Sequence, residues 1–300
     1  MTSKEYTFST FETCTFAQYN QNEYGAGLCM NPFLKWPGGK RWLANMIKDI
    51  APQQYSKYYE PFLGGGAVFF SLAPKNALIS DVNPELVNLY TAMRDCPMDL
   101  KQYMCDHNRL HSKEYYYRIR SAQFTEPVER AARFLYLNRT CYNGMYRVNR
   151  QGQFNVPIGT KSNCIYDIEL FEEYSRMLKN VDICTNDFSA TIQQATAGDL
   201  IFADPPYASA QKNDTSFLKY NDRLFTWDDQ IRLHNALVAA RIRGVSIILT
   251  NANNQEIKDL YSNSGFFIME VSRTSNIASK TEKRTIVSEL IITSFPHRNA

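Results

Sequence analysis

The sequence predicts an α/β fold, built on a doubly wound and mostly parallel sheet that carries a basic helical insert. Three observations support this prediction. The chain has 300 residues, of which 44% are hydrophobic and 21% charged, so it can bury one large core beside a smaller insert. Its first hundred residues alternate β-rich runs with helical patterns. Similar β-rich runs return after residue 175, as expected for a parallel sheet with helical crossovers.

The first elements follow from hydrophobic spacing and turn residues. Residues 41–50 place apolar side chains at helical intervals, and residues 58–60 predict a short strand. A glycine-rich turn then leads into a helix that starts at Ala67 and runs to Leu72. Residues 77–81 predict the second strand. Pro84 opens the next helix, because proline is best tolerated in the first turn.

The alternation lapses over residues 96–175, where arginine- and tyrosine-rich helical stretches surround a hairpin-like segment, residues 142–157. It resumes with three short apolar runs that fit strands buried on both faces: residues 181–184, 200–203 and 245–249. Two final runs, residues 266–271 and 286–292, predict a terminal antiparallel pair.

These patterns divide the chain into three parts. The sheet domain comprises residues 31–95 and 176–300, the insert comprises residues 96–175, and residues 1–30 form an extension without an assigned role. Within the sheet domain, the polar segment 208–225 is long for an internal loop, which predicts either a lid or simple disorder.

Composition excludes several classes of protein. No stretch approaches the roughly 18 apolar residues of a membrane span, and the first thirty residues lack the apolar core of a secretory signal, so we expect a cytoplasmic protein. The seven cysteines include no C-x-x-C pair, which favours reduced thiols over disulfides or zinc. Cys105, His107 and His111 could share one helix face as metal ligands, but we expect an exposed helix and no metal.

Positive charge gathers in two segments of a chain whose net charge is only +3. Residues 118–150 hold seven arginines against two glutamates, a local charge of +5, and residues 272–284 hold four basic residues against one glutamate, a local charge of +3. Two such segments suit a polyanion that lies across one face of the protein. Solvated helix or loop faces would give the same pattern.

The motif Asp204-Pro205-Pro206-Tyr207 directly follows the strand predicted to end at Ala203. Ligands of open α/β sheets bind outside the carboxyl ends of strands. Two prolines fix φ and remove two backbone donors, so this turn offers only acceptors, to which Asp204 adds a carboxylate and Tyr207 a flat ring. Such a cleft matches an amino group on a planar ring, although an ordinary strand-to-loop turn also explains the motif.

The segment Glu60–Gly66 ends the first strand with three glycines, which permit close backbone approach or positive φ. It is not a G-x-G-x-x-G dinucleotide motif, and Gly38-Gly39-Lys40 is not part of a P-loop. Asp81 ends the next strand, where an acid can accept both hydroxyls of a ribose. A nucleoside-bearing cofactor without a cradled pyrophosphate, such as S-adenosylmethionine, fits these features. A tight structural turn fits them as well.

Seven segments, taken together, resemble a known family. They are Phe33–Lys40, Glu60–Gly66, Asp81–Pro84, Leu135–Arg139, Tyr142–Gly144, Phe154–Pro157 and Asp204–Tyr207. In this order they resemble the Dam-type DNA adenine methyltransferases, and the resemblance runs from about Phe33 to Ile292. It implies a Rossmann-like methyltransferase core and a DNA target-recognition domain in the insert.

The resemblance also implies the reaction. Family members move a methyl group from S-adenosyl-L-methionine to the N6 amine of adenine in double-stranded DNA. The residues that match the catalytic motif are Asp204, Pro205, Pro206 and Tyr207. Those that match the cofactor site are Trp36, Lys40, Glu60, Phe62, Gly64, Gly66, Asp81, Asp187, Phe188 and Asp204.

A base inside a duplex cannot reach such a cleft, so the adenine is expected to be flipped out. Tyr207 would stack on it. Tyr142 resembles the family's aromatic residue that fills the gap, although a core residue of the hairpin would also explain it. Arg147 resembles the arginine that reads a guanine, and Lys35 resembles the lysine near the first base. The full set of expected DNA-binding residues is Lys35, Arg139, Tyr142, Asn143, Met145, Arg147, Pro157, Lys283 and Arg284.

GATC is the favoured target, although related enzymes with longer sites share much of this hairpin. A separately acting restriction endonuclease is a candidate partner, which the sequence does not decide. Two alternatives stay open at this stage. One is a DNA-binding relative without catalytic activity, and the other is an amino-methyltransferase that acts on RNA or protein.

Overall fold

A computed structural model of the chain describes residues 30–207, 225–274 and 286–296. The expected extension before residue 30, nearly all of the segment expected to form a lid, and both Lys283 and Arg284 lie outside the described residues. Among the residues that are described, no helix is long and apolar enough to cross a bilayer.

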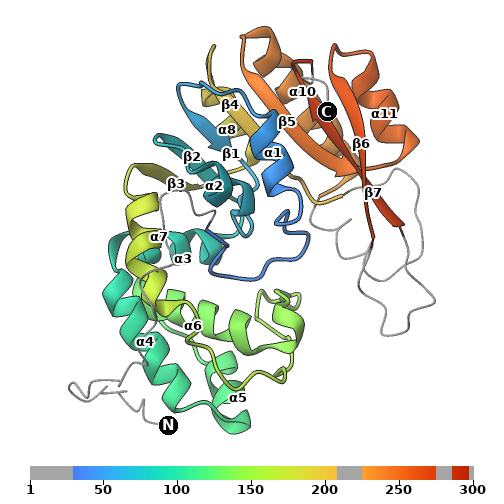
Figure 1. Cartoon of the computed structure of the whole chain (residues 1–300). Helices are drawn as coiled ribbons and strands as arrows, with labels where there is room; N and C mark the ends of the chain where they lie inside the picture. The colour runs from blue at the N-terminus through green and yellow to red at the C-terminus, as the bar shows by residue number, and fades with distance from the viewer. Residues whose placement is uncertain (1–29, 208–224, 275–285, 297–300) are drawn as a thin grey trace.

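Seven strands form one sheet in the order β3-β2-β1-β4-β5-β7-β6 (Figure 1). Their bounds are β1 Tyr58–Glu60, β2 Ala77–Asp81, β3 Val181–Thr185, β4 Leu200–Ala203, β5 Ser246–Ala252, β6 Phe267–Thr274 and β7 Ile286–Thr293. The neighbours from β3 to β5 pair in parallel, whereas β7 runs antiparallel to both β5 and β6. The predicted doubly wound, mostly parallel sheet and its terminal antiparallel pair are therefore confirmed. The detail that the sequence did not predict is that β7 lies between β5 and β6.

Helices cover both faces of this sheet. Those before β3 are α1 Ala44–Ile50, α2 Ala67–Leu72, α3 Pro84–Asp95, α4 Pro97–Arg109, α5 Lys113–Ser121, α6 Pro127–Thr140 and α7 Phe171–Leu178, with short 3-10 turns η2 Tyr142–Gly144 and η3 Ile168–Leu170. Those after β3 are α8 Phe188–Gln194, α10 Trp227–Ile242 and α11 Gln255–Ser262.

The strands alternate their side chains between two cores. Tyr58 of β1 belongs to the core that also contains α1, α2 and α3, whereas Tyr59 belongs to the core with α8, α10 and α11. The same alternation separates Ile248 from Leu249 on β5. Strands β1, β2, β4 and β5 are buried on both faces because successive side chains point in opposite directions, which explains their nearly continuous apolar runs. The expectation that residues 181–184 form such a strand is wrong, because β3 lies at the edge of the sheet and exposes Asp182 and Thr185.

The order of the strands reverses between β1 and β4. From β1 the chain moves outward to β2 and β3, and it then returns to place β4 on the other side of β1. Because Tyr59 pairs with Ile201, the carboxyl ends of β1 and β4 are neighbours. Glu60 and Asp204 therefore meet at the switch point where α/β sheets bind their ligands.

The insert packs onto the sheet domain through α3 and α6 and shares its hydrophobic core. Figure 1 shows α4, α5 and α6 gathered at one end of the molecule, away from β5, β6 and β7. The predicted hairpin appears as two antiparallel bridges, Cys141 with Ile158 and Val148 with Phe154.

The expectation of an exposed helix around Cys105 and His107 is wrong. Both side chains are buried, and the Nδ1 atom of His107 lies 2.7 Å from the Tyr115 hydroxyl. Burial lowers the pKa of His107 to about 4, so this imidazole stays neutral. The described residues contain no group of histidines, cysteines and carboxylates that could hold a metal ion.

Arg139 anchors the insert and does not reach the surface. The residue is 1% exposed, and its guanidinium donates to the carbonyls of Cys164 (2.9 Å), Tyr166 (2.6 Å) and Phe33 (2.9 Å). It also stacks on the Tyr166 ring, 4.2 Å from the ring centroid. The expectation that Arg139 binds DNA is therefore corrected, because its donors already hold three segments of this chain together.

We expect Arg139→Met to lower the free energy of unfolding by about 3 kcal/mol, because it leaves three buried carbonyls without their donor. Chemical denaturation would measure the change. Arg150→Met, at an exposed position on the hairpin, is the matched control and should change stability by less than about 0.5 kcal/mol. Equal stability of the two variants would contradict the anchoring role.

Candidate active site

Asp204, at the carboxyl end of β4, has one carboxylate oxygen bound by neighbouring side chains and one without such a partner among the described residues. Its Oδ1 atom lies 2.9 Å from the ammonium of Lys40 and accepts a hydrogen bond of 2.7 Å from the Thr250 hydroxyl. Within the described part of the chain, its Oδ2 atom accepts no hydrogen bond. The side chain is 17% exposed, so it is partly buried but still in contact with solvent. The open oxygen can accept a hydrogen from a ligand.

Burial and partners act in opposite directions on this carboxylate. Burial raises the pKa of Asp204, whereas the Lys40 ammonium and the Thr250 hydroxyl pull that pKa back down. The pKa of Asp204 is still raised overall, and the two partners oppose part of this rise and so favour the ionised form.

A second buried carboxylate, Glu289 of β7, completes the cluster. Its Oε2 atom lies 3.4 Å from the Lys40 ammonium and accepts a 2.7 Å hydrogen bond from the Tyr207 hydroxyl. Lys40 also donates to the Gly38 carbonyl at 3.1 Å and lies 4.7 Å from the centroid of the Tyr207 ring. Lys40 is thus surrounded by acceptors and by one aromatic face.

The sequence analysis missed both Glu289 and Thr250. Each is a buried polar residue within an otherwise apolar strand, and this was the available signal. A buried polar side chain needs a partner, so an isolated glutamate in the run 286–292 should have been treated as a candidate.

Glu60 lies at the neighbouring end of β1 and is fully buried. Burial raises its pKa well above the usual value, and the nearby charges of Asp204 and Asp81 add to the rise. The Tyr58 hydroxyl donates to it at 2.8 Å. Burial thus favours the protonated form of Glu60.

Asp81 is bound to the glycine turn. Its Oδ2 atom accepts from the backbone N–H of Gly64 at 3.1 Å and its Oδ1 atom from that of Asn83 at 2.9 Å. Gly64 has a φ of 48°, and a Cβ atom there would lie 2.7 Å from Cδ1 of Trp36. Trp36 thus packs directly on the turn, and only glycine permits both the backbone angle and this contact.

Aromatic rings gather near the end of β3. Phe62 stacks on Phe188 with 5.4 Å between ring centroids, and Phe225 meets Phe62 edge-on at 5.7 Å. Asp187 caps α8 by accepting from the Ser189 N–H at 3.0 Å, and Arg232 of α10 lies 3.0 Å from it. Carboxylates and aromatic faces thus line the carboxyl edge of β1, β2 and β3.

The hairpin residues expected to meet DNA lie mostly at the surface. Tyr142 is 55% exposed, and Asn143, Arg147 and Pro157 are exposed as well. The Arg147 Nε donates to Asn155 Oδ1 at 2.8 Å, which fixes the direction of its guanidinium. Met145, in contrast, is partly buried against the core.

Lys35 joins the hairpin to the loop before α1. Its backbone N–H and carbonyl are both bound by the Asn138 amide, at 3.0 and 2.7 Å. Its side chain lies against Gly144, where a Cβ atom would come within 2.5 Å of the lysine Cδ. Burial and the neighbouring Lys161 lower the pKa of Lys35.

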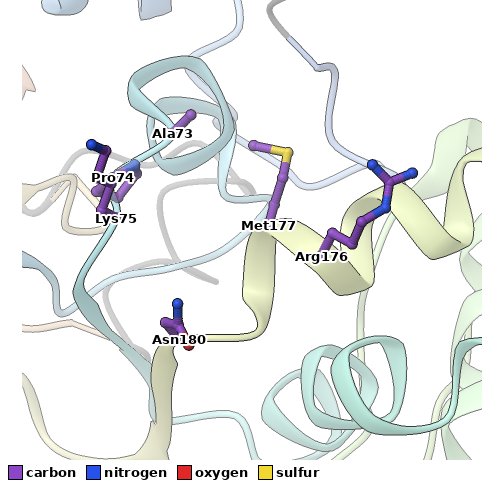
Figure 2. Close-up of a pocket in the computed structure, with 6 residues that line it drawn as sticks. All are labelled: Ala73, Pro74, Lys75, Arg176, Met177 and Asn180. Atoms are coloured by element: carbon purple, nitrogen blue, oxygen red, sulfur yellow. The ribbon is translucent and has the colours of Figure 1, made fainter.

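A separate pocket of about 170 Å³ lies at the opposite edge of the sheet (Figure 2). Its lining residues precede β2 and β3, and they are Ala73, Pro74, Lys75, Arg176, Met177 and Asn180. It is remote from the carboxyl ends of the strands, so it is not part of the site described above.

Comparison with known proteins decides the family. Residues 36–277 match the D12 class N6 adenine-specific DNA methyltransferase family. The chain belongs to this family. It is 38% identical over 275 residues to the Type II methyltransferase M1.LlaDCHI of Lactococcus lactis subsp. cremoris, covering 89% of this chain and 96% of the relative.

Two further relatives agree. The Type II methyltransferase M.MjaIII of Methanocaldococcus jannaschii is 35% identical over 290 residues, with 89% of this chain and 99% of the relative covered. The DNA adenine methylase of Haemophilus influenzae is 32% identical over 270 residues, with 87% and 92% covered. The chain is an adenine-specific DNA methyltransferase, and S-adenosylmethionine is its methyl donor.

The described residues fit this donor. Asp81 offers a carboxylate at the carboxyl end of β2, Phe62 and Phe188 offer ring faces near the end of β3, and the described residues contain no phosphate-binding loop motif. A carboxylate and aromatic rings without a phosphate-binding loop suit a nucleoside with a cationic sulfonium better than a nucleotide.

We expect Thr250→Val to shift the acid limb of the pH–rate profile of methyl transfer to higher pH by about one pH unit. The hydroxyl lowers the pKa of Asp204, so its loss raises that pKa and a higher pH is needed to ionise the carboxylate. Single-turnover rates between pH 5 and 9 would measure the shift.

Thr250→Ser keeps the hydroxyl and is the control, with an expected profile close to that of the wild type. If the valine variant keeps the wild-type acid limb, the ionisation of Asp204 does not control the rate.

Proposed function

We propose that the methyltransferase modifies adenine in GATC and acts on a base flipped out of duplex DNA. The observation that carries this proposal is the state of Asp204, one oxygen of which is held by Lys40 and Thr250 while the other is open beside Tyr207. The motif thus provides a hydrogen-bond acceptor at a partly buried position.

Asp204 Oδ2 and the Pro205 carbonyl accept one hydrogen each from the target amine in this proposal. The nitrogen lone pair, otherwise delocalised into the ring, is then directed out of the ring plane. S-adenosylmethionine supplies the electrophilic methyl group on its sulfonium. Catalysis by these residues is mainly positioning and electrostatic preorganisation, without a covalent enzyme intermediate.

The depth of Asp204 supports base flipping. A paired adenine cannot place its amine against a carboxylate that is 17% exposed, so the base must leave the stack at a cost of a few kcal/mol. Tyr142 is exposed on a turn whose next two residues have positive φ, 55° at Asn143 and 64° at Gly144. This turn presents the ring outward, where it would fill the gap left by the adenine.

The hairpin is the proposed reader of sequence. Arg147 is held in place by Asn155, as a bidentate contact to guanine requires. Lys35 lies next to the hairpin at Gly144, in reach of the first base of the site. We place the recognition of GATC on these two residues, with Asn143, Met145 and Pro157 around them.

Two relatives are named Type II methyltransferases. On this ground we propose a separate restriction endonuclease with the same target as a partner, and the cytoplasm as the site of action. Genomic DNA from cells that express the enzyme should then resist a nuclease blocked by adenine methylation in GATC.

The direct test incubates the protein with labelled S-adenosylmethionine and duplexes that contain or lack GATC. We expect label only in the GATC duplex, and none with Asp204→Ala, which should bind the donor within a few-fold of the wild type. Label in RNA or protein would support the alternative amino-methyltransferase. Absence of label in every substrate would support a DNA-binding relative without activity.

Arg147→Ala should reduce discrimination between GATC and sites altered at the guanine by about 1 to 3 kcal/mol, because the bidentate contact is lost. Transfer rates on the cognate duplex and on singly altered duplexes would measure this. Arg150→Ala, at an exposed position three residues on, should leave the discrimination unchanged. A uniform loss on all duplexes after Arg147→Ala would instead indicate a phosphate contact.

A further inference from the structure

Four side chains form a continuous buried chain beside the open oxygen of Asp204. Asp204 contacts Lys40, Lys40 contacts Glu289, and Glu289 accepts the hydroxyl of Tyr207, whose ring in turn faces Lys40. The Lys40 and Glu289 side chains are only 5% and 7% exposed. Two members, Asp204 and Tyr207, belong to the catalytic motif, whereas Glu289 comes from a strand 82 residues further along.

The register of β7 decides that Glu289 joins this chain. Glu289 pairs with Ala252 of β5, two positions from Thr250, so both Glu289 and Thr250 point to the same face of the sheet. That face is covered by α1, and Lys40 lies just before α1. A slip of one residue would turn Glu289 to the opposite face and leave Lys40 with one carboxylate.

Burial of Glu289 is costly for the fold. Its neighbours Leu290, Ile291 and Ile292 are fully buried, and an apolar residue would suit this strand at least as well. Buried ion pairs rarely stabilise a protein more than well-packed apolar residues do. A carboxylate here therefore indicates a use in the site.

The two contacts of Glu289 define that use. Its Oε2 atom accepts from the Tyr207 hydroxyl, which restrains the position of the outer end of the ring. The same oxygen attracts Lys40 and keeps the ammonium between both carboxylates, with Oδ1 as its nearest atom of Asp204. The Asp204 Oδ2 atom is thereby left for the substrate.

We propose that Glu289 is a positioning residue for methyl transfer, which sets the Tyr207 ring against the target base and directs Lys40 to one oxygen of Asp204. This inference rests on the proposed function, because it assumes that the base stacks on Tyr207. Glu289 does not contact the reacting atoms.

The test compares Glu289→Gln with the wild type in single-turnover methyl transfer. The amide can still accept from Tyr207 but no longer carries the charge that balances Lys40. We expect the transfer rate to fall by roughly 10- to 100-fold, since small misplacements of catalytic groups have effects of this size. The dissociation constants for S-adenosylmethionine and for DNA should stay within about threefold.

Glu270→Gln is the matched control. Glu270 lies on the adjacent strand β6 and also pairs with a lysine, Lys258, but at the surface. This variant should methylate at the wild-type rate. A wild-type rate for Glu289→Gln, or a parallel loss of donor binding and thermal stability, would overturn the positioning role.

Tyr207→Phe provides a second route if Glu289→Gln does not fold. It keeps the ring and removes only the hydroxyl that Glu289 holds, so the rate should fall at least fivefold with donor affinity unchanged. A wild-type rate would overturn the proposal. The rate of each variant is compared with that of the wild type on whichever adenine-containing duplex the wild type methylates. If the wild type does not methylate GATC, the proposed target is refuted but this comparison of rates still stands.

Discussion

The contact between the Lys40 ammonium and the Asp204 carboxylate is the interaction on which the rest of the site depends. A carboxylate this far from water would tend to be protonated, and the lysine at 2.9 Å opposes that tendency. The ammonium itself is buried, so it requires acceptors on every side, and the Gly38 carbonyl and Glu289 provide them. One ion pair thus connects the loop before α1 with β4 and β7.

The sheet topology makes this contact possible. The reversal of strand order between β1 and β4 places Glu60 and Asp204 at neighbouring strand ends, where burial raises the pKa of both carboxyl groups, and that of Glu60 strongly. The antiparallel entry of β7 next to β5 then adds Glu289 on the same face as Thr250. Each strand contributes one side chain to the recess, and the apolar residues around them exclude water and strengthen the electrostatic contacts.

The loop that carries Lys40 also connects α6 and the hairpin with Asp204. At its start, Asn138 of α6 binds both backbone groups of Lys35, and Arg139 binds the Phe33 carbonyl. Five residues after Lys35, the same loop places Lys40 against Asp204. This short segment, with hydrogen bonds at both ends, therefore holds the hairpin and the Asp204–Tyr207 motif in a fixed arrangement.

The sequence by itself determined the succession of strands and helices along the chain, the place of the Asp204–Tyr207 motif directly after β4 and the hairpin-like segment of residues 142–157, because local periodicity and turn residues fix them. The tertiary structure alone decided that Arg139 is an internal anchor, that β7 enters between β5 and β6, and that Thr250 and Glu289 meet Lys40. These outcomes depend on register and on burial between segments distant in the chain. The sequence pattern contains neither the register nor the burial of a residue. A buried arginine and a surface arginine therefore cannot be distinguished until the surrounding segments are placed.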